Sequence, residues 1–386
     1  MLRIAKREVA LLLTSKTILL FAVILPFVSF LFFTSLLKNG VARDLPIAII
    51  DLDNSAVSRN VISQLDATPE LQVSQTLINL QEGESLIRQG KIYGLVTIPK
   101  SFEANLKSGK QATIVNQYNS NVLLPSGLEF KAFSKVIGTI SAKIFIQKQL
   151  LKGIPFQQSI VNYQPVNLSN HVLSNPYTNY SYYLNSGFLA YFLQIIIILT
   201  TIYTFGIDLK YSKGNQLLRI SNRKLSSIVL GKILPYTLWF FLVGLIMYYS
   251  MFIWQDFPLN GSKTALLIGL FLLITASQSF GLLFIAISNS FREALTIGSG
   301  FAAISLSFSG ITFPVFSMAK ILQWISQVFP FTYFFNLFME QSQQGFPVFY
   351  SSKSIIALIL LSTLPIILTW HKLTKLILKG EFNHQI

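Results

Sequence analysis

The stretch "TILLFAVILPFVSFLFFTSLL", Thr17 to Leu37, decides the class of fold. It carries no charged residue, and a helix needs about 20 mostly apolar residues to cross the hydrocarbon core of a bilayer. It is also longer than the roughly 7–15 apolar residues of a cleavable secretion signal. The stretch therefore predicts a membrane-spanning helix that is retained as an anchor.

The composition of the whole chain favours lipid as its solvent. The 386 residues are 52% hydrophobic and only 12% charged, with a mean hydropathy of +0.55, whereas soluble domains are about a quarter charged. The chain has no cysteine, which excludes disulfides and thiolate chemistry, and His171, His371 and His384 are too far apart to suggest a metal site. The net charge of +15 is typical of membrane-protein loops, so we expect the lipid bilayer, and no nucleic acid, as a partner.

Five further apolar stretches predict membrane spans, which makes six in all. They are Ser186–Ile207, Ile233–Trp254, Ala265–Ile287, Ala294–Phe313 and the shorter Ser354–Trp370. These spans are almost free of charge. An ion-coupled carrier usually buries ionisable groups in its spans, so this composition counts against that class.

Lysines and arginines in the short connections set the expected orientation. With the N-terminus inside, cytoplasmic segments hold fourteen of them, against only Lys263, Lys320 and Lys353 in the short outer segments. We therefore predict a multi-pass protein of the bacterial plasma (inner) membrane with both termini in the cytoplasm. Residues 371–386 then form a cytoplasmic tail.

Residues 38–185 have a different composition and are predicted to form an extracytoplasmic α/β domain. They hold nine of the fifteen acidic residues. Predicted strands at Pro46–Asp51, Ile92–Ile98 and Ala112–Gln117 alternate with short helices. A long helix from about Gly127 to Leu151 resembles a stalk that returns towards the membrane.

One stretch of this domain resembles a catalytic motif. "IAIIDLDNSAVSR", Ile47 to Arg59, is similar to the nucleophile strand of haloacid-dehalogenase-like phosphatases, but no later cluster of carboxylates could hold the Mg²⁺ that these enzymes need. We predict instead that Asp51 ends a buried strand, while Asp53, Asn54 and Ser55 form a turn and cap the next helix.

A second stretch imitates a phosphate-binding loop. "GLVTIPKS", Gly94 to Ser101, has Pro99 where such a loop requires a glycine, and proline has no N–H to offer a phosphate. No other candidate occurs in the sequence. The chain is therefore predicted not to be an enzyme and to bind no cofactor directly.

Two segments on the predicted cytoplasmic side have functional patterns. Residues 1–16, "MLRIAKREVALLLTSK", place Leu2, Ala5, Val9 and Leu12 on one helical face, as expected of a helix lying at the membrane interface. The alternative is a basic flank that only orients the first span. The segment from Asp208 to Pro235 is long for a connector and carries six cations.

On the other side, Pro314 and Pro330 bracket two apolar stretches that are each too short to span. We predict that residues 314–345 form an outer re-entrant helix pair, since non-helical backbone at membrane depth is tolerated where protein buries it. The alternative is a pair of interfacial helices that only plug the outer leaflet.

Together these segments carry a family resemblance along nearly the whole chain. Arg7-Glu8 resembles the basic–acidic pair of the N-terminal interface helix in transmembrane (permease) subunits of type-2 ABC exporters. The coupling loop of that family is similar to the segment that carries Gly214, Leu217-Leu218 and Leu230-Gly231-Lys232. Its outer re-entrant motif is similar to Ser309-Gly310, Phe313-Pro314 and Pro330-Phe331-Thr332-Tyr333. The subfamily it resembles has a large extracytoplasmic domain between spans one and two.

The resemblance implies a fold, a function and partners. The fold is a polytopic α-helical membrane protein with six transmembrane helices, an extracytoplasmic α/β domain and an outer re-entrant pair. The function is export of a substrate that the sequence does not identify, driven by ATP in a separate ATP-binding subunit, with the permease acting as a homodimer or beside a paralogous permease. The alternative hypothesis is a membrane-anchored surface receptor or adsorption-type protein that works through its outer domain.

Two sets of residues are the expected functional positions. Coupling to the ATP-binding subunit is assigned to Arg7, Glu8, Gly214, Arg219, Arg223 and Lys224. The translocation and re-entrant motif is assigned to Gly310, Pro314, Pro330, Thr332 and Tyr333.

Overall fold

A computed structural model describes residues 1–176 and 178–382 of the chain. It divides into two units: Met1–Gly40 together with Val172–Ile386, called the bundle, and Val41–His171, called the inserted unit. The α/β segment thus begins three residues later and ends well before the predicted 38–185.

The bundle is helical, because its long apolar segments can satisfy backbone hydrogen bonds without water only within themselves. Its first half contains α1 (Leu2–Thr14), α2 (Lys16–Leu19), the π-helical turn η1 (Leu20–Ile24), α3 (Leu25–Leu36), α9 (Tyr180–Lys210), α10 (Gly214–Ile220), α11 (Leu225–Tyr249) and η2 (Ser250–Trp254). Its second half contains α12 (Lys263–Ile287), α13 (Phe291–Ser305), η3 (Val315–Ser317), α14 (Lys320–Ser326), α15 (Pro330–Phe338), η4 (Met339–Gln344), η5 (Val348–Ser351) and α16 (Ser352–Lys379).

Five helical segments in the described residues are long and apolar enough to cross a membrane. They are Lys16–Leu36, Tyr180–Lys210, Leu225–Trp254, Lys263–Ile287 and Val348–Lys379. The chain is accordingly mostly helical with five candidate membrane spans, which is consistent with the polytopic membrane protein that its sequence predicts.

The predicted span at Ala294–Phe313 is wrong in its extent. The helix there, α13, has 15 residues and ends at Ser305, and turns occupy most of the chain from there to Pro314. At about 1.5 Å per residue, α13 is shorter than the hydrocarbon core of a bilayer. The break falls among Ser307, Ser309 and Gly310, residues with low helix propensity.

Three other spans are longer than predicted. Helix α9 begins six residues before Ser186, α11 begins eight residues before Ile233, and α16 continues to Lys379. Most of the predicted tail 371–386 is therefore helix, and its last four residues lie outside the described part. Because polar residues lie at the ends of these helices, hydropathy alone underestimates their length.

Helix α1 forms where predicted, but it buries a different face. Its buried residues are Ile4, Glu8 and Leu12, four positions apart, whereas Leu2 and Val9 are exposed. Of the predicted face, Leu12 is buried while Leu2 and Val9 lie on the open side, which suits a helix whose outer side meets lipid. Hydropathy alone could not reveal that a glutamate belongs to the inner face.

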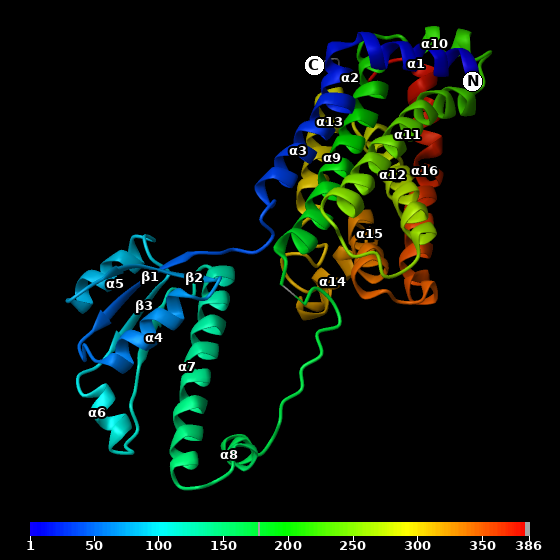
Figure 1. Cartoon of the computed structure of the whole chain (residues 1–386). Helices are drawn as coiled ribbons and strands as arrows, with labels where there is room; N and C mark the ends of the chain where they lie inside the picture. Colours follow the sequence, from blue (N-terminus) through cyan, green and yellow to red (C-terminus); the bar gives the residue numbers. More distant parts are fainter. Residues whose placement is uncertain (177, 383–386) are drawn as a thin grey trace. The chain divides into compact units, whose positions relative to one another are not determined.

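Within the predicted re-entrant segment 314–345 lie two short α-helices, α14 and α15, separated by residues 327–329. Helix α15 is deeply packed, with Phe331, Phe334 and Phe338 fully buried. Helix α14 instead exposes Ile321 and Trp324. Figure 1 shows both helices at the end of the bundle opposite α1 and α10.

A clasp within the bundle links the chain segments that precede and follow the inserted unit. The backbone N–H of Tyr180, the first residue of α9, donates to the carbonyl of Gly40 at 2.6 Å. Gly40 has a φ of +64°, and a Cβ there would overlap the side chain of Asn179, so only glycine fits. The clasp therefore places Gly40, the last bundle residue before the inserted unit, beside the start of α9.

The inserted unit is an α/β fold. Its elements are β1 (Leu45–Asp51), α4 (Ala56–Asp66), β2 (Leu71–Thr76), α5 (Leu80–Arg88), β3 (Gly94–Ile98), α6 (Phe102–Lys107), β4 (Val115–Tyr118), α7 (Leu123–Leu151) and α8 (Phe156–Tyr163). The sheet order is β2-β1-β3-β4, with β1 parallel to β2 and β3, and β4 antiparallel at the edge. One face packs against α4 and α7 through residues such as Ile49, Val96 and Val136, and the other face packs against α5.

The Asp51–Asp53 turn is a structural element of this unit. Asp51 accepts hydrogen bonds from the N–H groups of Asp53 and Asn54 and from the Ser58 hydroxyl, at 3.0–3.1 Å and 2.7 Å. Ser55 caps α4, as predicted. Asp53 does not cap that helix: it accepts from the N–H groups of Phe102 and Glu103 and so caps α6, 49 residues further along.

Candidate functional site

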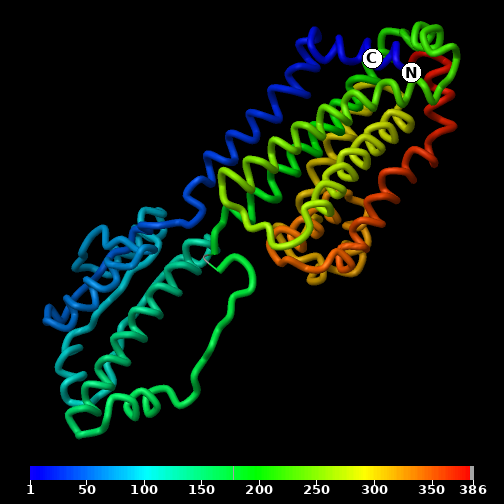
Figure 2. The backbone as a smooth tube through the Cα atoms, turned by 45° about the vertical axis from the view of Figure 1, so that its right-hand side comes forward, coloured from blue at the N-terminus to red at the C-terminus, as the bar shows by residue number. Residues whose placement is uncertain are grey.

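A buried network of charges joins the first helix to two spans. Its members are Arg7 and Glu8 of α1, Asp208 near the end of α9, and Lys232 and Tyr236 of α11. The three helices meet at the end of the bundle that also holds α10 and the end of α16, where Figure 1 and Figure 2 place the N-terminus.

Lys232 is at the centre of this network. Its Nζ donates to Glu8 Oε1 at 2.9 Å and to Asp208 Oδ2 at 2.6 Å, and it lies 5.2 Å from the centre of the Phe205 ring. An aromatic face attracts a cation, so the ammonium meets two carboxylates and one ring. Its side chain is fully buried, as is that of Glu8.

Arg7 completes the charge balance. Its two terminal nitrogens bind both oxygens of Asp208, at 2.9 Å and 2.5 Å, and one of them also lies 3.1 Å from Glu8. This two-point geometry is the strong form of an ion pair. The hydrogen bond to Asp208 raises the pKa of Arg7 above its usual value, so the guanidinium stays charged.

The network has two positive and two negative charges and every charged group has a partner. Tyr236 adds a hydrogen bond from its hydroxyl to Glu8 Oε2 at 3.3 Å. Removing one member of such a set leaves an uncompensated buried charge, which is far more costly than replacing a whole pair. The network therefore fixes α1 against α9 and α11.

The sequence assigned Arg7 and Glu8 to this region but missed Asp208, Lys232 and Tyr236 as their partners. Contrary to the expectation of nearly uncharged spans, Asp208 and Lys232 lie within span-length helices and are buried. A signal was available, because Asp208 is the only acidic residue between Glu129 and Asp256. An isolated ionisable group in a span predicts a partner.

Two glycines allow close packing around the network. A Cβ at Gly231 would lie 2.9 Å from Cβ of Ile4, so its absence lets α1 lie directly on α11. A Cβ at Gly214, a predicted coupling residue, would lie 2.3 Å from Cα of Gly380 just after α16. Helix α10 is thus in backbone contact with the end of the last long helix.

The other predicted coupling residues point away from this core. Arg219, Arg223 and Lys224 are exposed, and none of them forms an ion pair within residues 1–176 and 178–382. Buried Leu217 and Leu218 anchor the helix that carries them. The predicted coupling residues thus fall into separate groups. Arg7 and Glu8 belong to the charge network, whereas Arg219, Arg223 and Lys224 are exposed on α10 and the turn after it.

The predicted re-entrant motif converges at the opposite end. Gly310 has a φ of +91°, which permits the turn after α13, and the Thr332 hydroxyl donates to the Phe308 carbonyl in that turn at 3.1 Å. Pro330 is the first residue of α15, a position that needs no N–H. Tyr333 is half-buried, whereas Pro314 is exposed and away from this contact.

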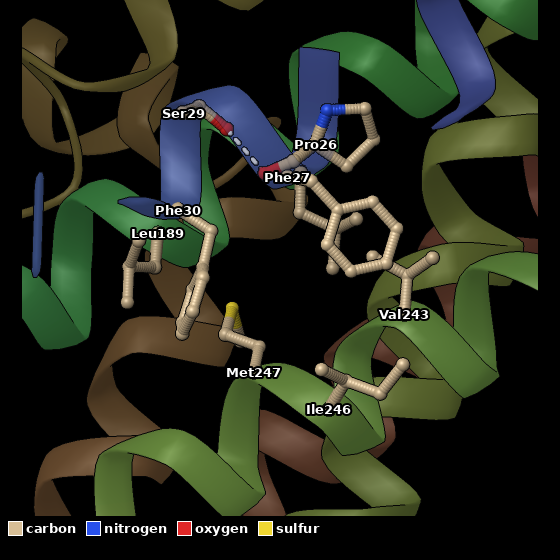
Figure 3. Close-up of a pocket in the computed structure, with 9 residues that line it drawn as sticks. Pro26, Phe27, Ser29, Phe30, Leu189, Val243, Ile246 and Met247 are labelled. Carbon is tan, nitrogen blue, oxygen red and sulfur yellow. Dashed lines mark hydrogen bonds between the residues drawn. The ribbon is translucent and has the colours of Figure 1, made fainter. Parts of the chain in front are cut away.

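A cavity between α3, α9 and α11 is too small for a substrate. Its volume is about 20 Å³, which is room for roughly one water molecule. Figure 3 shows Phe30, Leu189 and Met247 beside it, and the Ser29 hydroxyl bonded back to the Pro26 carbonyl. The space is a small packing defect between apolar side chains and not a binding site.

The inserted unit buries one carboxylate without compensation. Glu129 of α7 is fully buried and neither of its oxygens has a hydrogen-bond partner in this unit, all of which the structure describes. Burial raises its pKa from 4.5 to about 7, although the nearby Asn116 amide opposes the rise. At neutral pH this group is therefore close to half protonated.

This pKa makes the stability of the inserted unit depend on pH. Because the pKa of Glu129 is higher folded than unfolded, the unfolding free energy falls as pH rises from about 4.5 to about 7 and then levels off. Glu129→Gln is expected to remove this fall and to stabilise the unit by roughly 3 kcal/mol at about pH 8. Hydrogen exchange in β3, β4 and α7, corrected for intrinsic rates, measures this. Exposed Glu82→Gln is the control, and an unchanged pH profile for Glu129→Gln would contradict the assignment.

The amino-acid sequence is similar to that of known proteins. Residues 16–371 match the protein family described as ABC-2 family transporter protein. The linearmycin resistance permease protein LnrN of Bacillus subtilis (strain 168) is 23% identical over 301 residues, which cover 74% of this chain and 76% of that protein. ABC transporter G family member 20 of Dictyostelium discoideum is 23% identical over 367 residues, covering 94% of this chain but 48% of that protein, so the chain spans about half of this relative's length.

Proposed function

Because the chain belongs to the ABC-2 family of transporter proteins, we propose that this permease is the membrane subunit of an ATP-driven exporter, energised by a separate ATP-binding subunit. Family membership and two transporter-named relatives establish the transport role. Export, the energy source and the partner are the proposed part.

One observation carries the proposal. The end of the bundle that holds α1, α10 and the end of α16 combines a rigid interior with exposed cations. Ile4, Leu217 and Ile377 belong to one apolar cluster, and the charge network lies beside it. Arg219, Arg223 and Lys224 project from this support. Helix α10 lies between α9 and α11 in the chain and contacts α16, so a partner that pushes on α10 would act on these three long helices at once.

The proposed assembly is a dimer, with a second copy or a paralogous permease. Helix α13 supports it: Thr296, Ser299, Gly300 and Ala303 form an exposed face of small residues, and a Cβ at Gly300 would meet open space. In membranes, small residues let helix backbones approach closely and so mark faces that pack against another helix. The exported substrate is not specified by these features.

We place the charged end in the cytoplasm of a bacterial cell and the inserted unit outside. Both described chain ends lie at the charged end, which requires an even number of passes. We count α13 with the following 306–314 segment as the sixth. The excess of lysines and arginines in connections at this end supports its cytoplasmic location.

Cysteine labelling tests this topology in a chain that has no cysteine of its own. Ser120 and Ser226 are both exposed, in the inserted unit and at the start of α11. In intact cells, an impermeant thiol reagent is expected to label Ser120→Cys and to leave Ser226→Cys unlabelled until the membrane is broken. Labelling in the reverse pattern would refute the orientation.

Reconstitution tests the division of labour. The purified permease in lipid vesicles is expected to hydrolyse no ATP and to move no substrate, whereas addition of an ATP-binding subunit encoded beside it should give hydrolysis that depends on both chains. Hydrolysis by the permease alone would overturn the proposal. Full cellular activity without any ATP-binding subunit would favour the receptor alternative, which works through the inserted unit alone.

A further inference from the structure

The inserted unit has a second feature that the proposed transport cycle does not use. A groove of about 320 Å³ opens between α6, the 110–114 segment and the far half of α7. It exists because β4 has only four residues, so the chain before it does not pair with the sheet and stands away from the long helix. This volume falls within the roughly 300–1,000 Å³ of small-molecule sites.

The walls of the groove are apolar. Phe102 and Leu106 come from α6, and Ala112 and Ile114 come from the segment before β4. Helix α7 contributes Phe133, Ile137, Ile140, Ile144 and Phe145, spaced so that they fall on one helical face. Such a lining suits an alkyl chain and offers few hydrogen bonds to a polar ligand.

The groove is also lined by Gln111 and Ser141, and two lysines supply its positive charge. Lys110 and Lys148 both line the groove, and neither forms an ion pair within this unit. Lys148 Nζ donates one hydrogen bond to the Leu106 carbonyl at 2.7 Å, which leaves two of its three N–H groups for a ligand. The neighbouring Lys107 is already paired with Glu103 at 2.8 Å.

The surrounding charge selects for an anion. Residues 100–152 contain eight lysines, Lys100, Lys107, Lys110, Lys131, Lys135, Lys143, Lys148 and Lys152. They contain two acidic residues, of which Glu103 is ion-paired and Glu129 is buried. No carboxylate lines the groove. An anionic head group at its mouth would meet attraction and no opposing charge.

From these observations we infer that the groove binds a single-chain acidic lipid, with its acyl chain along α7 and its anionic head group between Lys110 and Lys148. The apolar lining of the groove suits the acyl chain, and the two lysines suit the head group. A neutral lipid of the same length would leave both ammonium groups without an anionic partner. The inference concerns the inserted unit alone and does not depend on the direction of transport or on ATP.

Photolabelling of the full-length permease tests this binding. The protein is placed in nanodiscs of zwitterionic lipid and irradiated with a palmitate that carries a diazirine in its chain, and labelled peptides are mapped by mass spectrometry. We expect saturable labelling of residues 102–114 and 133–148 that unlabelled palmitate displaces. The matching diazirine hexadecanol, which is neutral, should label these peptides about tenfold less, since it lacks the charge-assisted contacts.

Paired variants separate the site from general charge. Lys110→Gln with Lys148→Gln should reduce the palmitate labelling of these peptides about tenfold. Lys135→Gln with Lys143→Gln removes the same charge from exposed positions of α7 and should leave it unchanged. Ile144→Trp, which fills the groove, should abolish it while the melting temperature stays near that of the parent.

Three results would overturn the inference. They are equal labelling by palmitate and hexadecanol, an equal loss in both lysine pairs, or labelling confined to the bundle. A unique thiol from Ser141→Cys, at the groove, tests a different occupant. Oxidative cross-linking of two permease chains through it, blocking palmitate labelling, would show that a second copy fills the groove instead.

Discussion

Lys232→Met is expected to lower the unfolding free energy of the permease by about 3–5 kcal/mol, because it leaves Glu8 and Asp208 as buried carboxylates with one cation between them. Methionine keeps the length and apolar stem of lysine, so packing is nearly preserved and the loss reports the charge. The measurement is denaturant unfolding of the purified protein in detergent. Helix α1 should also lose its protection from hydrogen exchange, since its inner face is held through Glu8.

A double variant distinguishes charge imbalance from the loss of lysine itself. Glu8→Gln with Lys232→Met removes one charge of each sign and leaves the Arg7–Asp208 pair intact. It is expected to be clearly more stable than the sum of the single effects predicts, since no net charge remains buried. Exposed Lys263→Met serves as the control and should change stability little. Additive single effects, or a neutral Lys232→Met, would contradict the network's proposed role.

The second large effect concerns the exposed cations of α10 and the turn that follows it. Arg219→Gln with Arg223→Gln is expected to weaken binding of the ATP-binding subunit by about 2 kcal/mol, or roughly thirtyfold, and to reduce transport accordingly. Both side chains are exposed and lack an ion pair in the described chain, so the fold should not change. Affinity is measured by titrating the partner onto permease in nanodiscs, beside a transport assay.

Two controls make this test specific. Lys372→Gln with Lys375→Gln removes two exposed cations of α16 at the same end of the bundle and should leave affinity and transport unchanged. Arg223 also has a φ of +63°, a conformation that costs a non-glycine residue about 1–2 kcal/mol. Arg223→Gly should therefore stabilise the turn yet still impair transport, whereas Asn222→Gly, at a φ of +53°, should stabilise it without impairment. Equal transport in all four variants would leave membrane orientation as the only role of these cations.

Much of the fold follows from local patterns in the sequence. Thr17–Leu37 identified the first span because lipid imposes a single requirement, about 20 apolar residues in succession. Strands β1 and β3 were located to within two residues, since buried parallel strands are continuous apolar runs bounded by turns. Ser55 could be assigned as the cap of α4 because it immediately precedes its helix.

The features that could not be predicted depend on distant residues. Asp53 caps α6 rather than the adjacent helix, and no local pattern contains a contact made 49 residues away. The inner face of α1 contains Glu8, which pattern analysis places on the polar side until its partners on α9 and α11 are known. The early end of α13 had a local cause instead: the apolar stretch continues past Ser305, but Ser307, Ser309 and Gly310 favour a turn.

The clasp between Gly40 and Tyr180 has a consequence for how such a protein evolves. Gly40 and Tyr180 of the bundle are held together by a hydrogen bond, so for the folding bundle the chain between them, inserted unit included, is a loop that this contact closes. Loop-closure entropy grows only slowly with the length of the intervening chain, at about 0.6 kcal/mol for each doubling. Insertions at this point can therefore lengthen, shorten or be exchanged between lineages with little cost to the membrane part. Selection on what the insertion binds is in this way separated from selection on the bundle that carries it.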